Sequence, residues 1–321
     1  MSDENRPAFE LITNFRSPTF LALEEAAPRI GGRVSALPDL DGVAALRERA
    51  PLGALVFMYG SPLLAESAID LFRSEGIPVA VWQVDDPGYL HRPELREVTI
   101  RVARKADVYF SHTLELEEEY AALGVRVEYL PTAARRLPGS ERMCAPPPRD
   151  EELRLDYAFM ATASPERRRA WRRLKELLPD RLRGRFVSRF DPVEGLHHQR
   201  YARVSLYLGA HTGTGGRPDG WGLSERSWEV PLVGGLLLQE DRRHLRDHFQ
   251  PGVDPDVSSA VAFESLEECA EKIVWLCEHP MERRAITTRA QARVVEQHML
   301  EHRLARIAER LRAVRGAGAR A

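Results

Sequence analysis

Cysteine and long apolar stretches are scarce in this chain of 321 residues. It contains three cysteines, Cys144, Cys269 and Cys277, and they form no CxxC pair. This spacing argues against a disulfide framework and predicts reduced thiols. No apolar run approaches the roughly 20 residues that span a bilayer, and the polar start, MSDENRP, lacks the apolar core of a signal peptide. We therefore expect a cytoplasmic protein without a transmembrane segment.

Lysine is also rare, and neither sign of charge dominates. Of the 46 basic residues only Lys105, Lys175 and Lys272 are lysines, so arginine supplies the rest. The net charge of −2 gives no reason to expect nucleic acid or an anionic membrane as a partner. Arginine presents a planar fork of donors that suits phosphate wherever it faces a ligand.

The length predicts two domains, because single hydrophobic cores stop growing at about 250–300 residues. Strand-like and helix-like segments alternate along the first half of the chain, and such βαβα order predicts a parallel sheet covered on both faces. The predicted strands are 9–13, 33–36, 54–58, 78–84, 108–110 and 125–130, with helices near 20–27, 43–49, 63–74, 95–105 and 114–123.

A second series of the same kind follows a proline-rich segment at 138–150, which we interpret as a linker. Its predicted strands are 155–161, 185–188, 204–208, 236–239 and 261–263, with helices at 165–178, 194–201, 225–233 and 266–278 and a helical tail at 281–315 broken near His298. The fold class is therefore α/β, with two Rossmann-like, doubly wound parallel-sheet domains whose strand carboxyl ends face a common cleft. We expect domains at 1–140 and 151–297 and a terminal helix within 298–321 that returns to the first domain.

The most informative motif is Gly222-Leu-Ser-Glu-Arg-Ser-Trp-Glu229, followed by Gly234-Gly235 and an apolar strand. Ser224 is placed to cap a helix, and Arg226 and Glu229 then lie one turn apart on one face. A helix start attracts an anion, and a carboxylate one turn deeper can accept two hydrogen bonds from a vicinal diol. Phosphate with a ribose diol indicates a nucleotide, and the arrangement suggests a nucleotide sugar. The alternative is an ordinary cap with an Arg–Glu surface pair.

Ser164-Pro-Glu-Arg167 has the order expected at the start of a helix that follows the first strand of the second domain. Arg167 or Arg168 can therefore pair with a diphosphate at that helix start. A solvated basic helix face is the competing interpretation, because five arginines cluster there.

Asp85 and Asp86 end a predicted strand of the first domain, and His112 follows the next strand. Adjacent carboxylates raise one another's pKa, which suits proton abstraction from an acceptor hydroxyl, and His112 is a second candidate base. Helix capping by the aspartates and a merely polar rim histidine are the alternatives. The aspartates lack the Asp-x-Asp spacing of metal-dependent transferases, so we expect neither a metal nor a cofactor.

The glycine-rich stretch His211–Gly222 has two interpretations, a closing loop over a ligand and a mobile surface loop. His244 with His248, and His298 with His302, have the i,i+4 spacing of zinc ligands, but neither pair has an obvious third ligand. Surface or interdomain roles are therefore expected for both pairs.

Several segments together resemble the CgeB-like (spore maturation protein B) family of glycosyltransferases, a group-1-type branch of the GT-B fold. They are Trp82-Gln-Val-Asp-Asp-Pro87, Ala106–Phe110, Gly124–Pro131, Tyr157–Arg168, Glu225–Glu229 with Gly234-Gly235, and His298 with Arg303. One departure is Phe159-Met-Ala161, where the family has a Phe-x-Gly turn.

The resemblance implies a metal-independent transferase that moves a sugar from a nucleotide-diphosphate sugar to an unknown acceptor. It places the acceptor on the first domain and the donor on the second. A catalytically silent nucleotide-sugar-binding partner protein and a sugar-nucleotide epimerase remain as alternatives. The candidate catalytic residues are Asp85, Asp86 and His112, and the candidate donor-binding residues are Arg167, Arg168, Gly222, Ser224, Glu225, Arg226 and Glu229.

Overall fold

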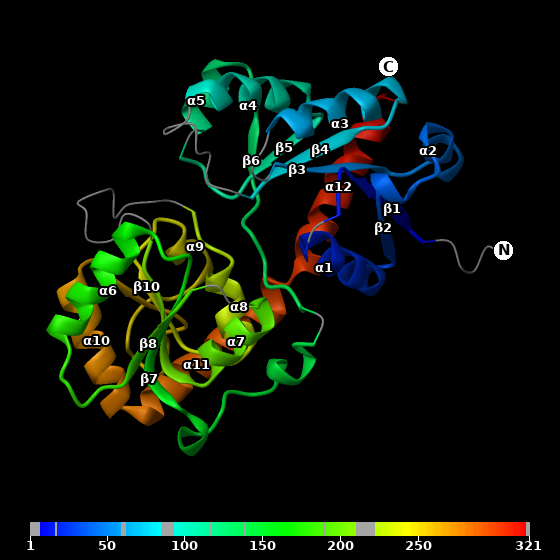
Figure 1. Cartoon of the computed structure of the whole chain (residues 1–321). Helices are drawn as coiled ribbons and strands as arrows, with labels where there is room; N and C mark the ends of the chain where they lie inside the picture. Colours follow the sequence, from blue (N-terminus) through cyan, green and yellow to red (C-terminus); the bar gives the residue numbers. More distant parts are fainter. Residues whose placement is uncertain are drawn as a thin grey trace. The chain divides into compact units, whose positions relative to one another are not determined.

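The computed structural model divides into two compact units, of which Met1–Arg135 with Leu300–Ala321 form the first and Arg136–Met299 the second. Each unit is a parallel sheet covered by helices on both faces (Figure 1). Within the described ranges, no helix is both long and apolar enough to cross a membrane. The structure describes residues 7–16, 18–58, 62–84, 93–115, 117–137, 139–188, 191–209 and 222–318.

The first unit contains a six-stranded parallel sheet in the order β2-β1-β3-β4-β5-β6. The central strands β3 and β4 are buried along their whole length, as expected for a parallel sheet with both faces covered. Its strands are β1 Phe9–Thr13, β2 Gly32–Ala36, β3 Gly53–Met58, β4 Val79–Gln83, β5 Val108–Ser111 and β6 Val127–Tyr129.

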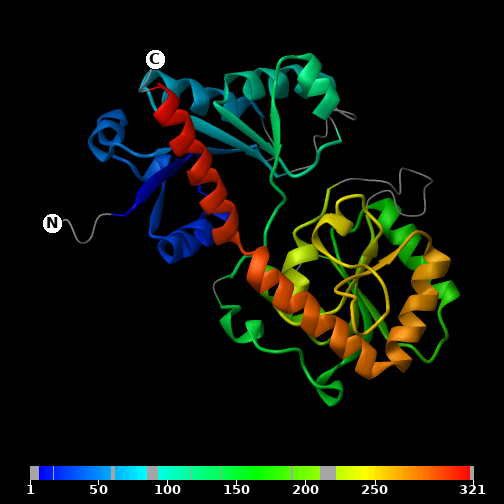
Figure 2. The same cartoon turned by 180° about the vertical axis from the view of Figure 1, so that it is seen from behind.

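Alternating side chains of β3 divide the core of the first unit into two layers. Leu55 and Phe57 pack with α1 and α12 on one face, and Val56 and Met58 pack with α3 and α4 on the other. Figures 1 and 2 show α12 in red on the face opposite α3 and α4, so the end of the chain completes this unit. The helices are α1 Pro18–Ala26, α2 Val43–Arg49, α3 Pro62–Ser74, α4 Pro93–Lys105, α5 Glu117–Ala122 and α12 Leu300–Gly318.

The second unit contains a five-stranded parallel sheet in the order β11-β10-β9-β7-β8. Because β7 is the first strand of this sheet and β9 the third, the strand order reverses between them, and ligands of such sheets bind at the carboxyl ends of strands on either side of this point. Its strands are β7 Leu155–Met160, β8 Gly184–Val187, β9 Ala202–Tyr207, β10 Leu237–Glu240 and β11 Val261–Phe263.

Helices α6 and α10 cover one face of this sheet, and α7, α8 and α11 cover the other (Figure 1). Helix α11 ends at Gln297 and α12 begins at Leu300, so the helical tail breaks at His298. The helices are α6 Pro165–Leu177, α7 Pro192–Arg200, α8 Arg226–Leu232, α9 Leu245–His248, α10 Leu266–Glu278 and α11 Pro280–Gln297.

The proline-rich segment that the sequence suggested as a linker is bound to the second unit. The guanidinium of Arg200, at the end of α7, donates to the carbonyl oxygens of Met143 and Ala145 at 3.0 Å each, to Pro146 at 2.8 Å, and to Val233. Gln291 also donates to the Ala145 carbonyl at 2.9 Å. These bonds satisfy backbone groups that a free linker would leave to water.

Gly234 closes helix α8 and lies against this anchored segment. Its φ is +71°, and its N–H and that of Gly235 donate to the carbonyls of Pro231 and Val230 at 2.8 and 2.9 Å, which is a Schellman motif. A Cβ at position 234 would lie 2.9 Å from the Arg200 guanidinium and 2.9 Å from Cα of Pro147.

We expect Gly234→Ala to lower the free energy of unfolding of the second unit by about 3 kcal/mol, because left-handed strain adds to a steric clash. Gly139→Ala is the matched control, since Gly139 has φ +86° but open space around its Cβ position. Its expected loss is only about 1 kcal/mol. Urea unfolding followed by circular dichroism measures both, and equal losses would show that the contact with Arg200 and Pro147 has no energetic role.

Candidate functional site

The carboxyl ends of β7, β9 and β10 lie at one edge of the second-unit sheet, because these strands are parallel neighbours. Residues that follow these ends are therefore brought together although they are far apart in sequence. Met160 leads into the start of α6, Tyr207 ends β9, and Glu240 ends β10. We call this edge the donor-side edge, after the donor-binding role that the resemblance implies for the second domain.

Helix α6 begins at the donor-side edge as the sequence predicts. Ser164 is its N-cap and accepts a hydrogen bond from the backbone N–H of Arg167 at 3.3 Å, and Pro165 occupies the first turn. The hydroxyl cap and the fixed φ of proline favour a helix start at this point. The predicted cap at Ser164 is confirmed.

The two candidate arginines of α6 have different surroundings. Arg167 is partly buried, donates to the carbonyl of Thr162 at 3.3 Å, and has a buried Nε that no described residue accepts from. Arg168 is exposed and donates to the carbonyl of Ala163 at 3.4 Å. Of the two arginines, Arg167 is therefore the one whose side chain is placed to bind a ligand at the donor-side edge.

Arg226, at the start of α8, lies near enough to Arg167 for the two charges to act on each other. Burial lowers the pKa of the Arg226 guanidinium below its ordinary value, and the positive charge of Arg167 adds to this, whereas Tyr207, Glu225 and Glu229 oppose it. Within the described residues neither arginine forms an ion pair with a carboxylate. Two partly buried cations that repel each other, neither in an ion pair with a described carboxylate, make a site where an anion is stabilised.

Tyr207 lies between two cations at the end of β9. The guanidinium carbons of Arg226 and Arg242 are 5.8 and 5.6 Å from the centre of its ring, within the range of cation–π attraction. The aromatic ring therefore attracts both guanidiniums.

Glu240 and Arg242 form hydrogen bonds with Gly209 and Gly222, the described residues on either side of the stretch 210–221. Glu240 accepts from the backbone N–H of Gly209 at 3.0 Å and pairs with Arg242 at 2.9 Å. Arg242 in turn donates to the carbonyl of Gly222 at 3.3 Å. This pair holds Gly222 and the start of the donor motif at the same edge.

Helix α8 carries the rest of the motif. Glu229 is buried, with 8% of its surface exposed, and lies one turn after Arg226. Glu225, the N-cap, is partly buried. The structure thus brings Arg226 and Glu229 together with Arg167 at the donor-side edge. Because Glu229 is buried, Arg226 and Glu229 are not the exposed surface ion pair that the sequence offered as the alternative.

The prediction that Ser224 caps this helix is wrong. Helix α8 begins at Arg226 with Glu225 as its N-cap, and the Glu225 side chain does not cap it. The backbone N–H of Ser227, which a Ser224 hydroxyl would bind, donates instead to the Ser224 carbonyl at 3.0 Å. The Ser224 hydroxyl oxygen is buried and has no partner among the described residues.

The acceptor-side candidates belong to the first unit. His112 follows β5, is 7% exposed, and its backbone N–H donates to the Gln83 carbonyl at 3.1 Å, which places it at the carboxyl end of β4 and β5. Asp85 and Asp86, together with the loop residues 211–221, lie outside the described residues.

The histidine pairs with zinc spacing have other surroundings. The rings of His248 and His298 pack on Trp228 with centroid distances of 5.2 and 4.6 Å. Among the residues that the structure describes, no group of three or more His, Cys, Asp and Glu side chains could hold a metal ion.

Sequence reasoning missed Tyr207, Glu240 and Arg242. Two of them end strands of the second sheet and the third lies two residues further on, so strand ends, searched systematically for polar and aromatic side chains, would have found them.

Residues 161–309 match a family model described as glycosyl transferase-like. No curated protein is similar enough in sequence to count as a match. HepE of Anabaena in complex with UDP-glucose is 12% identical with a TM-score of 0.61, and the alignment covers 95% of this chain and 100% of that one. An alpha-glucosyltransferase in complex with UDP is 11% identical with a TM-score of 0.60, over 95% and 100% of the two chains.

UDP-GlcNAc 2-epimerase from Neisseria meningitidis bound to UDP-GlcNAc is more distant, at 9% identity and a TM-score of 0.52, over 94% and 99% of the two chains. At such identities the likeness concerns the fold alone. It shows that the chain has the GT-B fold of two parallel-sheet α/β domains, and the predicted fold class is confirmed.

Proposed function

We propose that this chain is a glycosyltransferase that transfers a sugar from a nucleotide-diphosphate sugar to an acceptor hydroxyl, in the manner of the CgeB-like family. One observation carries the proposal. Arg167 and Arg226, two partly buried guanidiniums without a carboxylate partner in the described ranges, lie beside the buried Glu229. They do so within the stretch that matches a glycosyl transferase-like family model.

In this proposal the arginines bind the diphosphate and Glu229 binds the ribose. A guanidinium fork can donate two parallel hydrogen bonds to phosphate oxygens, and a buried carboxylate can accept from both hydroxyls of a vicinal diol. The Ser224 hydroxyl, which has no partner in the described part of the chain, and the backbone of Gly222 and Glu225 complete the donor set, and Arg168, being exposed, has a peripheral part.

During transfer an acceptor oxygen forms a bond to the anomeric carbon of the sugar, and the bond between that carbon and the diphosphate oxygen breaks. Negative charge then grows on the leaving diphosphate, where Arg167 and Arg226 stabilise it. We assign removal of the acceptor proton to the first unit, with His112, Asp85 and Asp86 as the candidate bases. Because the cations come from the protein, the proposed reaction needs no metal and no cofactor besides the donor.

Ala161, which replaces the glycine of the family's Phe-x-Gly turn, does not argue against activity. It is 1% exposed and belongs to the apolar core of the second unit. Its methyl group therefore packs inward with the core, and an inactive protein is not required to explain it.

The test is a thermal-shift panel of UDP, GDP, TDP and their sugars, followed by an assay of donor consumption with EDTA present. We expect one nucleotide and its sugar to raise the melting temperature, and UDP compounds are the first to try because the similar structures contain them. Donor turnover that continues in EDTA supports a metal-independent transferase. Binding without turnover would indicate the silent partner protein, and conversion of the donor sugar without an acceptor would indicate an epimerase.

A further inference from the structure

A pocket of about 260 Å³ lies at the opposite edge of the second-unit sheet. Its lining includes Leu153, Ala202 and Leu236, which stand at or just before the starts of β7, β9 and β10. It shares no residue with the donor-side edge. We call it the basic pocket, because five arginines and only two carboxylates line it.

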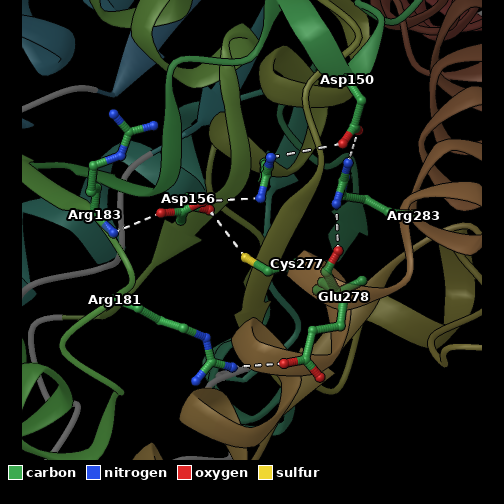
Figure 3. Close-up of polar contacts among 9 residues, drawn as sticks. Asp150, Asp156, Arg181, Arg183, Cys277, Glu278 and Arg283 are labelled. Carbon is green, nitrogen blue, oxygen red and sulfur yellow. Dashed lines mark hydrogen bonds and ion pairs between the residues drawn. The ribbon is translucent and has the colours of Figure 1, made fainter.

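Both carboxylates already form ion pairs with arginines of the pocket. Asp150 pairs with Arg283 and lies 3.9 Å from Arg203, which pairs more closely, at 3.2 Å, with Asp156 outside the pocket lining. Figure 3 shows the Asp150 carboxylate pointing toward Arg283. The other acid, Glu151, lies 3.8 Å from Arg149, and both of these side chains are exposed.

Two of the arginines have no carboxylate partner within the described part of the chain. Arg200 is 6% exposed, and its acceptors there are backbone carbonyls. Arg284 is exposed and forms no ion pair with a described residue. A buried cation with only neutral partners is costly to keep, and an anion in the adjacent pocket would lower this cost.

The start of α11 adds to the positive charge around the pocket. Pro280 and Met281 line the pocket, and Arg283 and Arg284 follow within the first two turns of this 18-residue helix. The first backbone N–H groups of a helix have no partner within the helix, and this end carries the positive side of the dipole. The pocket therefore combines arginine side chains, two of them buried, with a helix start.

We propose that the basic pocket binds a small oxyanion, either inorganic phosphate or the phosphate group of a small metabolite. Because guanidinium groups outnumber carboxylates in the lining, the ligand should be an anion. The volume of the pocket limits the size of that anion. The volume is smaller than the roughly 300–1,000 Å³ of pockets for drug-sized ligands, so it admits a phosphate or a sugar phosphate. This site is separate from the proposed donor site and can be occupied at the same time.

Isothermal titration with inorganic phosphate tests the proposal on the full chain. The Arg226→Gln variant is the starting protein, because it weakens the anion site at the donor-side edge. We expect this protein to bind phosphate at millimolar concentration or below, and the further change Arg284→Gln to weaken the binding about tenfold, as expected for one lost charge-assisted bond. Arg172→Gln is the matched control, since Arg172 is an exposed arginine of α6 outside the pocket.

Each outcome of these titrations either supports or contradicts the proposed phosphate site. Arg284 is exposed, so its replacement should leave the second unit folded, and Arg149→Gln serves as an independent second variant. Equal affinity with and without Arg284 and Arg149, or no phosphate binding by the Arg226→Gln protein, would overturn the proposal. A parallel titration with a sugar phosphate separates the two sources, because tighter binding than phosphate indicates a metabolite and equal binding indicates the free ion. Neither result depends on whether the chain transfers sugar.

Discussion

Replacing Glu229 with alanine should weaken binding of the nucleotide sugar about 100-fold while the second unit stays folded. Glu229 is buried beside Arg226, and we assign it two hydrogen bonds to the ribose diol. Hydrogen bonds to a charged group contribute roughly 1.5–3 kcal/mol, and about 2.7 kcal/mol corresponds to a factor of 100 in affinity. Calorimetric titration with the nucleotide found by the thermal-shift panel measures the change.

Two further variants make this result interpretable. Glu229→Gln keeps the size of the side chain and one acceptor oxygen, so we expect a loss of about tenfold. Glu271→Ala removes an exposed carboxylate of α10, far along the chain from the motif, and should leave affinity unchanged. Circular dichroism and urea unfolding show that each variant is folded. Unchanged nucleotide affinity in a folded Glu229→Ala protein would remove Glu229 from the site.

Replacing Arg226 with glutamine should lower kcat by about 10²–10³-fold, the usual cost of losing one group that stabilises charge in a transition state. The guanidinium of Arg226 has no carboxylate partner among the described residues, so its charge is available to the leaving diphosphate. Arg226→Lys should recover part of kcat, because the charge returns without the planar fork.

The two kinetic constants separate the possible roles of Arg226. A fall in kcat with little change in KM means that the guanidinium acts mainly in the transition state, whereas a rise in KM alone means that it only binds the donor. Arg172→Gln again serves as the control on a neighbouring surface of the unit. A fully active Arg226→Gln protein would contradict the assignment of the diphosphate to this arginine.

The sheet architecture could be predicted from sequence because its signals are local. Strand β3 is a continuous apolar run, β4 is apolar up to its last residue, Gln83, and both strands lie fully buried in the first unit. The start of α6 follows from Ser164 and Pro165, which act within one turn of the chain. Gly234 and Gly235 mark the end of α8 for the same reason, because a positive φ favours glycine.

Features that depend on distant contacts could not be predicted in this way. The proline-rich segment looks like a linker because prolines favour extended chain, but Arg200, more than 50 residues away, binds its carbonyls. Ser224 has the composition of a cap, yet its own carbonyl takes the amide that its hydroxyl would bind. A cap depends on the φ and ψ of its residue, and the sequence alone does not determine these.

The residues of the candidate site also fall into two groups, those predicted from local sequence and those that depend on distant contacts. Arg226 and Glu229 were recognised because their spacing in one helix is a local property. Tyr207, Glu240 and Arg242 join them only through the pairing of β9 with β10, which brings together segments that are 30 residues apart. The choice of Arg167 over Arg168 also required coordinates, because it depends on which side of α6 is buried.

The central claim is that arginines and one buried glutamate at the carboxyl edge of the second-unit sheet hold a nucleotide-diphosphate sugar. A crystal structure of the full chain with the nucleotide that stabilises it most gives the most direct test. We expect the diphosphate within hydrogen-bonding distance of Arg226 and Arg167 and the ribose hydroxyls against Glu229. A nucleotide bound elsewhere on the chain, with these three side chains free of it, would contradict the claim.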